Sequence, residues 1–166
     1  MDHFQRLKLD EMFFEADQLI AEKKLSDAIN TLESILIEAP DYGKAYNHLG
    51  WIYETKYKDI KKAEEFYKKC VLYSPDYPAV YINLAIVLSS QGKYEELETH
   101  LNSALQVPGV EKSSIYNEFA IMYELQGKFH QAIESYKNAI RNTLSENNLE
   151  TYNKSIKRCK TKLEIL

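Results

Sequence analysis

The apolar residues of this chain recur at intervals of three and four, and the whole pattern returns every 35 residues. Between Tyr81 and Leu88, apolar side chains at positions 81, 84, 85 and 88 mark one face of a helix. Tyr46, Tyr81 and Tyr116 are spaced 35 residues apart and open three successive copies. A repeat of this length indicates supersecondary units that stack on one another.

Each copy divides into two helices at a short polar break. In the copy that opens at Tyr81, the first helix ends near Gly92, which can take the positive φ that terminates a helix. A second helix is predicted from about Tyr94 to Val107, and Pro108 stops it. Each copy is therefore predicted to be a pair of antiparallel helices.

Two copies depart from this pattern. In the copy that opens at Tyr46, the stretch from Tyr53 to Ala63 is one residue longer than the stretch from Leu88 to Leu97 in the next copy, and we predict that a wider turn between residues 55 and 60 holds the extra residue. An earlier, degenerate copy ends at Pro40 and carries Glu15 where the later copies have apolar residues. Such divergence suits a terminal repeat, whose outer face meets water. We expect residues 2–8 to extend its first helix.

A last segment follows a polar break at residues 142–148 and has the pattern of a single amphipathic helix. Its apolar residues form one stripe, made of Leu149, Tyr152, Ile156, Cys159 and Leu163. Its other face is basic and carries Lys154, Lys157, Arg158, Lys160 and Lys162. No second helix is predicted after it, so we interpret this helix as a cap on the last repeat.

The motifs resemble the tetratricopeptide repeat. The likeness is best in Tyr46-Asn47-His48-Leu49-Gly50-Trp51-Ile52-Tyr53 and in Gln91-Gly92-Lys93-Tyr94-Glu95-Glu96. The resemblance implies an all-α fold, a superhelix (solenoid) of about four helix pairs with a C-terminal capping helix. First helices would line a concave groove, and second helices would form the convex back. The predicted single domain, 1–166, has repeats at about 9–42, 43–77, 78–112 and 113–146 and a capping helix at about 147–166.

Most of the recurring residues are interpreted as packing residues. Gly50, Ala85 and Ala120 lie on the first helices, where small side chains let helices approach closely. Cys70 occupies the position that Ala104 holds in the next copy, so we interpret it as a small buried thiol rather than a nucleophile.

Composition narrows the classes of protein that this chain can be. With 45% hydrophobic and 28% charged residues it is globular, and a net charge of −4 provides no general attraction to nucleic acid or anionic membranes. The N-terminus lacks the basic and apolar regions of a signal peptide, and no apolar run is long enough to cross a bilayer. The 2 cysteines form no CxxC motif or disulfide framework. We predict a cytoplasmic protein.

The chemistry of an enzyme is missing from the sequence. The 4 histidines are scattered without metal-ligand spacing, and we find no phosphate-binding loop, nucleophile elbow or paired acid and base. We predict no catalytic residue, no cofactor and no metal ion.

The residues of the first helices that lie off the packing stripe are the candidates for partner binding. The predicted contacts are Asn47, His48, Trp51, Asn83, Ile86, Glu118 and Ile121. Trp51 is the only Trp, and Trp is enriched among binding hot spots, although sideways packing against a neighbouring helix is the alternative. The resemblance implies that Asn47 and Asn83 bond the backbone of an extended peptide.

A specialised form of the family binds a C-terminal carboxylate with Lys, Arg and Asn side chains. Of the positions that the resemblance assigns to this clamp, only Asn83 matches, and the basic residues are absent. We therefore predict no carboxylate clamp. Because the first helices carry Asp17, Glu54, Glu118 and Glu124, we expect the groove to prefer an apolar or mildly basic segment.

The predicted function is a scaffold or adaptor that binds a peptide or helix of a partner protein in the concave groove. The alternative is a structural protein that self-associates into a homo-oligomer, suggested by Phe4, Phe13 and Phe14 in the degenerate first repeat. A weaker alternative is association with RNA through the basic residues of the last helix. The partner itself cannot be identified from the sequence.

Overall fold

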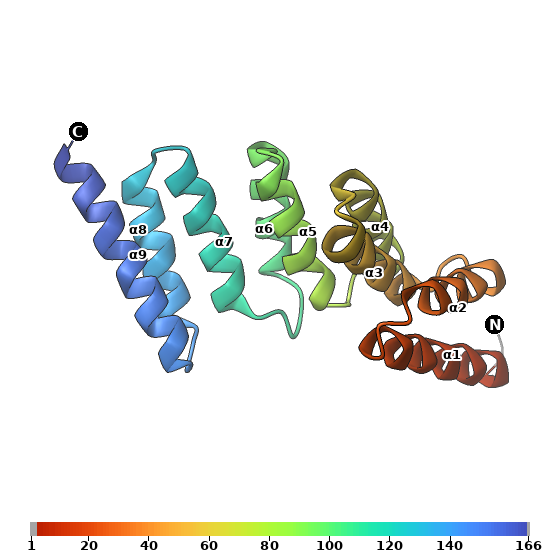
Figure 1. The fold of residues 1–166 in the computed structure, drawn as a ribbon. Coiled ribbons are helices and arrows are strands. Elements are labelled where there is room, and N and C mark those ends of the chain that lie inside the picture. Colours follow the sequence, from red (N-terminus) through yellow and green to blue (C-terminus); the bar gives the residue numbers. More distant parts are fainter. Residues whose placement is uncertain (1–2, 166) are drawn as a thin grey trace. The chain divides into compact units, whose positions relative to one another are not determined.

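Every element among the residues described by the computed structural model, 3–165, is helical (Figure 1). The elements are α1 (His3–Ala21), α2 (Leu25–Glu38), α3 (Gly43–Ile52), the π-helix η1 (Tyr53–Tyr57), α4 (Ile60–Tyr73), α5 (Ala79–Ser90), α6 (Tyr94–Ala104), α7 (Lys112–Leu125), α8 (Phe129–Arg141) and α9 (Glu146–Ile165). They form two compact units, residues 1–87 and 88–166, and α5 begins in the first and ends in the second.

In the first unit, α1 packs on α2, α2 on α3 and α3 on α4. Residues spaced three, four or seven apart turn inward from each helix, because that spacing keeps them on one face. The buried cluster consists of Leu9, Ala16, Ala28, Leu32, Ile35, Ala39, Ala45, Leu49 and Ile52. Helix α1 begins by His3, in agreement with the predicted extension, while residue 2 lies outside the described residues.

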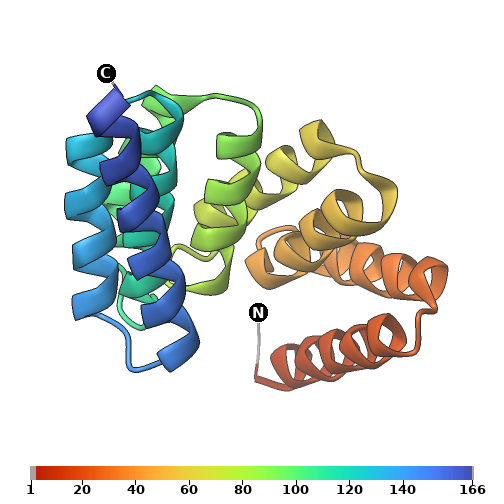
Figure 2. The ribbon, with the colours of Figure 1, turned by 60° about the vertical axis from the view of Figure 1, so that its left-hand side comes forward.

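In the second unit, α6 packs on α7, α7 on α8 and α8 on α9, and the last two lie side by side in Figure 2. The buried cluster consists of Ala120, Ala132, Ile133, Tyr136, Ala139, Tyr152 and Cys159. Two of its members, Tyr152 and Cys159, come from the predicted apolar stripe of α9. Helix α9 thus covers the apolar face of α8, as a capping helix does.

A left-handed residue occupies the turn inside every helix pair. Its φ is +63° at Lys23, +58° at Lys58, +68° at Gly92 and +72° at Gly127. Glycine adopts this conformation without strain, whereas the Cβ of lysine collides with the backbone there. Two repeats therefore make the same turn with the favoured residue and two make it with a strained one.

The extra residue of the repeat that opens at Tyr46 lies inside a helix, so the predicted wider turn is wrong. After Ile52 the helix continues as η1, a π-helical turn over Tyr53–Tyr57. A π-turn holds one more residue than an α-turn, so it absorbs an insertion without breaking the helix. Lys58 then turns the chain, and the carboxylate of Asp59 caps α4 by accepting from the backbone N–H of Lys62 at 3.0 Å.

Close helix packing depends on Gly50. A Cβ at this position would lie 2.6 Å from the Cδ1 and Cε1 atoms of Tyr67, whose side chain is completely buried. The predicted role of the small residues is seen directly here, because the α4 ring occupies the space that a side chain on α3 would fill.

Candidate partner-binding site

The predicted contact residues fall in both units. Asn47, His48 and Trp51 lie on α3, and Asn83 and Ile86 lie on the part of α5 in the first unit. Glu118 and Ile121 lie on α7 in the second unit. In the first unit, the structure brings together Asn47, His48, Trp51 and Asn83. The surface that these residues form with Asp17 and Ile20 is called the first-helix face.

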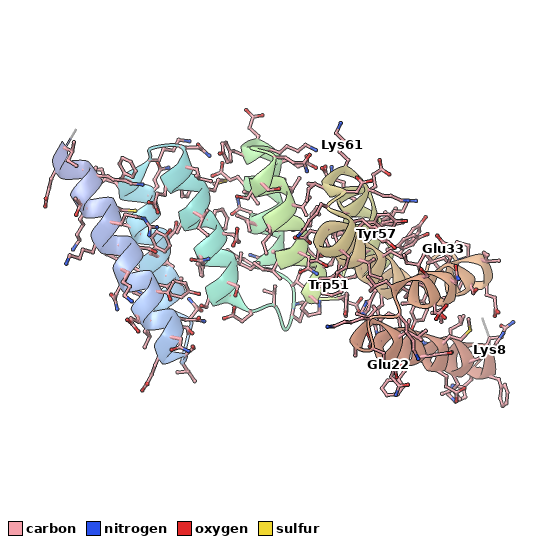
Figure 3. All side chains as sticks on the ribbon, in the orientation of Figure 1. Lys8, Glu22, Glu33, Trp51, Tyr57 and Lys61 are labelled. Carbon is pink, nitrogen blue, oxygen red and sulfur yellow. The ribbon has the colours of Figure 1, made fainter. Side chains whose placement is uncertain are left out.

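The first-helix face contains a hollow of ≈ 270 Å³. Its lining is Asp17 and Ile20 from α1 and Asn47, His48 and Trp51 from α3. Three of the predicted contact residues therefore surround one concavity between neighbouring first helices. Figure 3 labels Trp51 on α3, and it labels Tyr57 at the end of the π-helical turn that follows.

An acid–imidazole contact joins α1 to α3 at this hollow. Nε2 of His48 lies 2.6 Å from Oδ1 of Asp17, and Nδ1 of His48 lies 3.2 Å from the backbone oxygen of Lys44. A carboxylate and a backbone carbonyl both only accept hydrogen bonds, so Nε2 donates to Asp17, and Nδ1 also donates to Lys44 only when both ring nitrogens carry a proton. The edge of the imidazole also packs on Phe13, with ring centroids 4.5 Å apart. His48 is thus held from three directions.

An amide–amide bond joins α3 to α5. Nδ2 of Asn83 donates to Oδ1 of Asn47 over 3.0 Å. Asn47 is only 6% exposed and lines the hollow, and this bond engages its Oδ1 and leaves its Nδ2 unused. Nδ2 of Asn47 makes no hydrogen bond to any residue between 3 and 165. It is therefore a fixed donor available to a carbonyl of a bound chain.

Trp51 lies at the edge of the hollow, with part of its side chain packed and part accessible. Its ring is half-buried and packs against the core of the first unit. Nζ of Lys56, from η1, lies 5.0 Å from the centroid of the same ring, which is within cation–π range. The ring also lines the hollow, so packing fixes its position while part of it stays accessible.

Glu118, in the second unit, is the one acidic residue among the predicted contacts, and it is buried. Its side chain is 8% exposed, and it has no hydrogen bond or ion pair with any residue of the described chain, 3–165. Burial alone raises its pKa to about 7. No hollow described for this protein includes Glu118, and Ile121 beside it is half-buried.

Two acids that the sequence placed along the groove have partners in other helices. Oε2 of Glu54 accepts from the Tyr67 hydroxyl at 2.6 Å. Glu124 accepts from both Arg158 and Lys162 of α9, at 2.7 and 2.8 Å, and these bonds hold its pKa down at about 2. The charge of Glu124 is therefore neutralised by α9 within the fold. Part of the basic face of α9 is turned toward α7.

Ile20 and Lys56 were not found by sequence reasoning. Ile20 belongs to the degenerate repeat, where the alignment of positions is weakest, and Lys56 reaches the Trp51 ring only because η1 extends the helix. The π-turn is signalled in the sequence by the one-residue insertion, although the insertion does not say which helix or turn absorbs it.

Neither cysteine has the environment of a reactive thiol. Cys70 and Cys159 are both free and fully buried, and burial raises their pKa to about 12 and about 11. Within residues 3–165 no group of three or more His, Cys, Asp or Glu side chains is arranged to hold a metal ion. In the same part of the chain, the helices are all too short or too polar to cross a bilayer.

Comparison with known proteins agrees with the repeat pattern. Residues 43–77 and residues 118–148 each match a sequence profile of the tetratricopeptide repeat. No curated protein matches the sequence.

Solved structures of repeat proteins match over most of the chain. PilF of Pseudomonas aeruginosa is 20% identical, with a TM-score of 0.81 over 96% of this chain and 71% of PilF. A MamA protein is 18% identical, with a TM-score of 0.71 over 94% of this chain and 90% of MamA. A thermophilic tetratricopeptide-repeat protein of Thermus thermophilus is 16% identical, with a TM-score of 0.63 over 89% of this chain and 81% of that protein.

At these identities the likeness to solved structures shows the fold. It confirms the predicted all-α solenoid class, and the two profile matches confirm the repeat type. Proteins built from such repeats are generally scaffolds for protein–protein interaction. The chain is a tetratricopeptide-repeat protein.

Proposed function

We propose that this protein is an interaction scaffold that holds an extended or helical segment of a partner protein against its first helices. The observation that carries the proposal is the hollow of the first-helix face, where Asn47 is 6% exposed and still presents an unpaired Nδ2. No buried side-chain nitrogen or oxygen of the described residues lacks a hydrogen-bond partner, so this unpaired donor is reached by solvent and can bond a ligand that enters the hollow.

Preorganisation supplies the mechanism. Asp17 holds His48, Asn83 holds Asn47, and the core holds Trp51. Because these side chains are already ordered, binding a segment costs little of the conformational entropy that a flexible loop would lose. The partner's backbone would accept from Nδ2 of Asn47, while its side chains would contact Trp51 and Ile86, which is 43% exposed.

The proposed ligand is not a C-terminal carboxylate. The hollow has a carboxylate of its own in Asp17, and a second one would meet it without a lysine or arginine in the lining. Glu118 and Ile121, on α7 of the second unit, are also proposed as contact residues. The scaffold is proposed to use no cofactor, to catalyse no reaction and, with a net charge of −4, to bind no nucleic acid. Its free, buried thiols suit the reducing cytoplasm.

The test is selection of peptides from a displayed random library on the purified protein, followed by calorimetry with the enriched peptides. We expect Trp51→Ala together with Asn83→Ala to weaken binding at least about tenfold. The matched control changes two exposed residues of second helices, Asn30→Ala and Leu72→Ala, and should change affinity less than about twofold. Equal loss in both variants, or loss in neither, would refute a site on the first-helix face.

A second candidate function, self-association, is favoured by one specific observation. Phe4, Leu7 and Phe14 of α1 are 83%, 48% and 63% exposed and follow one another on the side of the helix opposite its buried Leu9 and Ala16. Large apolar side chains gathered on an exposed face often mark an interface. Light scattering at tens of micromolar protein would test it. A monomer, or an oligomer unaffected by Phe4→Ser and Phe14→Ser, would exclude association through this face.

A further inference from the structure

We propose that the hollow between α1 and α3 is a slot for a lysine or arginine side chain of the bound segment. In this slot the aliphatic stem would lie along Ile20 and Trp51, and the cationic head would meet Asp17. The inference rests on the proposed function, since it names the side chain that the first-helix face selects. It goes further by assigning a ligand chemistry to one concavity.

The carboxylate of Asp17 is placed to receive a cation. One oxygen, Oδ1, is bound by Nε2 of His48 at 2.6 Å, and this contact fixes the direction of the carboxylate. The other, Oδ2, makes no hydrogen bond within residues 3–165, and the side chain of Asp17 is 47% exposed. An ammonium or guanidinium group bound at Oδ2 would form a charge-assisted hydrogen bond with an acceptor that is already oriented.

The walls of the hollow suit the stem that leads to such a head group. Ile20 provides an aliphatic surface, and Trp51 provides an aromatic one next to it. Lysine and arginine bury their methylene stems along apolar surface while the charge stays at a polar rim. An indole ring adds cation–π attraction, and Lys56 already uses the ring of Trp51 in this way at 5.0 Å.

Other ligand chemistries fit the lining less well. An acidic side chain would meet the Asp17 carboxylate, and the imidazole beside it, His48, has both ring nitrogens directed at oxygens of the protein. An aliphatic side chain would remove Asp17 from water without supplying a partner, which costs free energy. A basic side chain can pack its stem on the apolar wall and pair its charge with the carboxylate.

A competing cation, Lys56, belongs to the protein itself. Lys56 is exposed and does not line the hollow, so it leaves the slot open while adding positive charge near the ring. Because Lys56 adds positive charge nearby, we expect the slot to bind a single basic side chain with moderate affinity. Within a longer bound segment, the slot would select for a basic residue at one position. We expect Lys56→Gln to tighten binding of a cation modestly, by less than about threefold at physiological salt.

The experiment uses the full chain and small probes of defined charge. N-acetyl-arginine methylamide and N-acetyl-lysine methylamide are titrated while the indole N–H signal is followed by two-dimensional NMR. The chain has a single Trp, so that signal reports on Trp51 alone. Uncharged probes of similar shape, the citrulline and norleucine derivatives, test whether the charge is needed. The glutamate derivative tests the opposite sign.

A matched pair of variants of α1 locates the contact. Asp17→Asn keeps the shape of the side chain and removes its charge, and Glu15→Gln removes a charge from an exposed residue of the same helix. We expect Asp17→Asn to weaken arginine binding about tenfold or more, the effect of losing a hydrogen bond between two charged groups. Glu15→Gln should change it less than about twofold. Thermal unfolding of both variants checks that they fold.

The outcomes separate this inference from the proposed function. Saturable indole shifts with the arginine and lysine probes, abolished in Asp17→Asn, support the slot. Equal shifts with citrulline, or full binding in Asp17→Asn, overturn it, and the comparison with citrulline needs no variant at all. If library peptides bind through Trp51 and Asn83 but carry no fixed basic residue, the slot is refuted while the proposed function stands. If no peptide uses the first-helix face, both fail.

Discussion

Asn83 donates a hydrogen bond from Nδ2 to Oδ1 of Asn47 over 3.0 Å, and this bond ties α5 to α3. The two residues are 36 positions apart, one repeat plus one residue, so they lie side by side only when consecutive repeats stack. The bond has a structural role and a proposed functional one. It joins neighbouring helix pairs, and it leaves Nδ2 of Asn47 unused.

Replacing Asn83 by alanine should destabilise the protein. The change leaves Oδ1 of the buried Asn47 without its donor, and an unsatisfied buried acceptor costs about 1–3 kcal/mol. Urea unfolding followed by circular dichroism would measure the free energy of unfolding. The control is Asn153→Ala, at an exposed position inside α9, which should be neutral or slightly stabilising because alanine favours helix. Equal stability changes in the two variants would contradict a structural bond.

Glu118 should make the protein less stable as the pH rises. Its pKa is 4.5 in an unfolded chain and about 7 in the fold, so the folded state holds the proton more tightly. Its stabilising contribution is complete below pH 4.5 and is lost as the pH passes from 4.5 to 7. Glu118→Gln should remove this dependence and stabilise the protein at pH 8 by up to about 3 kcal/mol.

The measurement for Glu118 is the free energy of unfolding at pH 5 and pH 8, compared between the wild type and Glu118→Gln. Glu15→Gln, at an exposed position, is the control and should leave the pH profile unchanged. If Glu118→Gln is less stable than the wild type at pH 8, the carboxylate must have a partner, and the assignment of a buried, unpaired acid is wrong.

Glu124 should show the opposite pH dependence. Its bonds to Arg158 and Lys162 hold its pKa at about 2, so its contribution is present above pH 4.5 and is lost as the pH falls toward 2. At pH 7, Glu124→Gln should cost about 2 kcal/mol, the scale of hydrogen bonds to charged groups. The difference from the wild type should shrink on acidification to pH 2.5. The control is Glu134→Gln. Glu134 forms an exposed ion pair with Lys137, so this variant should have little effect on stability at either pH.

Lys58→Gly should stabilise the protein. Lys58 has a φ of +58°, and a lysine in the left-handed region costs about 1 kcal/mol that glycine avoids. Lys61→Gly, three residues further on and inside α4, serves as the matched control (Figure 3). It should lower stability by less than about 1 kcal/mol, because Lys61 is the second residue of α4 and glycine is a poorer helix former than lysine. Thermal unfolding of both variants is the measurement. A loss of stability in Lys58→Gly would show that the lysine side chain stabilises the fold by more than its backbone strain costs.

Gly50→Ala should be strongly destabilising. The added methyl group would lie 2.6 Å from the ring of Tyr67, which is buried and bonded to Glu54, so the ring has no room to move. Overpacking of this kind costs about 1–3 kcal/mol. The same substitution in a Tyr67→Leu background should cost less, because the smaller side chain leaves space. An equal cost in both backgrounds would rule out the steric explanation.

The helical pairs and their packing faces could be predicted from local spacing. The intervals of three and four place Leu49 or Ala120 on a buried face whatever the rest of the chain does, since burial follows the period of the helix. The positive φ at Gly92 was predicted for the same reason, from the conformational freedom of one residue. These features depend on residues within one or two turns of each other.

The composition of the site could be predicted only in part. Asn47, His48 and Trp51 do line one hollow, and so does Asp17, which the sequence places among the acids of the groove, whereas the contribution of Ile20 depends on how α1 lies against α3. Glu124 was placed along the groove by the sequence, and the structure adds that Arg158, 34 positions away, binds it. A charge pair of this kind leaves no trace in the spacing of apolar residues.

The 35-residue period alone predicts a stack of helix pairs, because it repeats the apolar positions that each helix must bury. The packing of the helices sets where the extra residue of the second repeat lies, which carboxylates are paired and which donor of Asn47 remains available. Those outcomes are set by distances between side chains on different helices. Such distances follow from the packing of whole elements, and periodicity along the chain does not encode them.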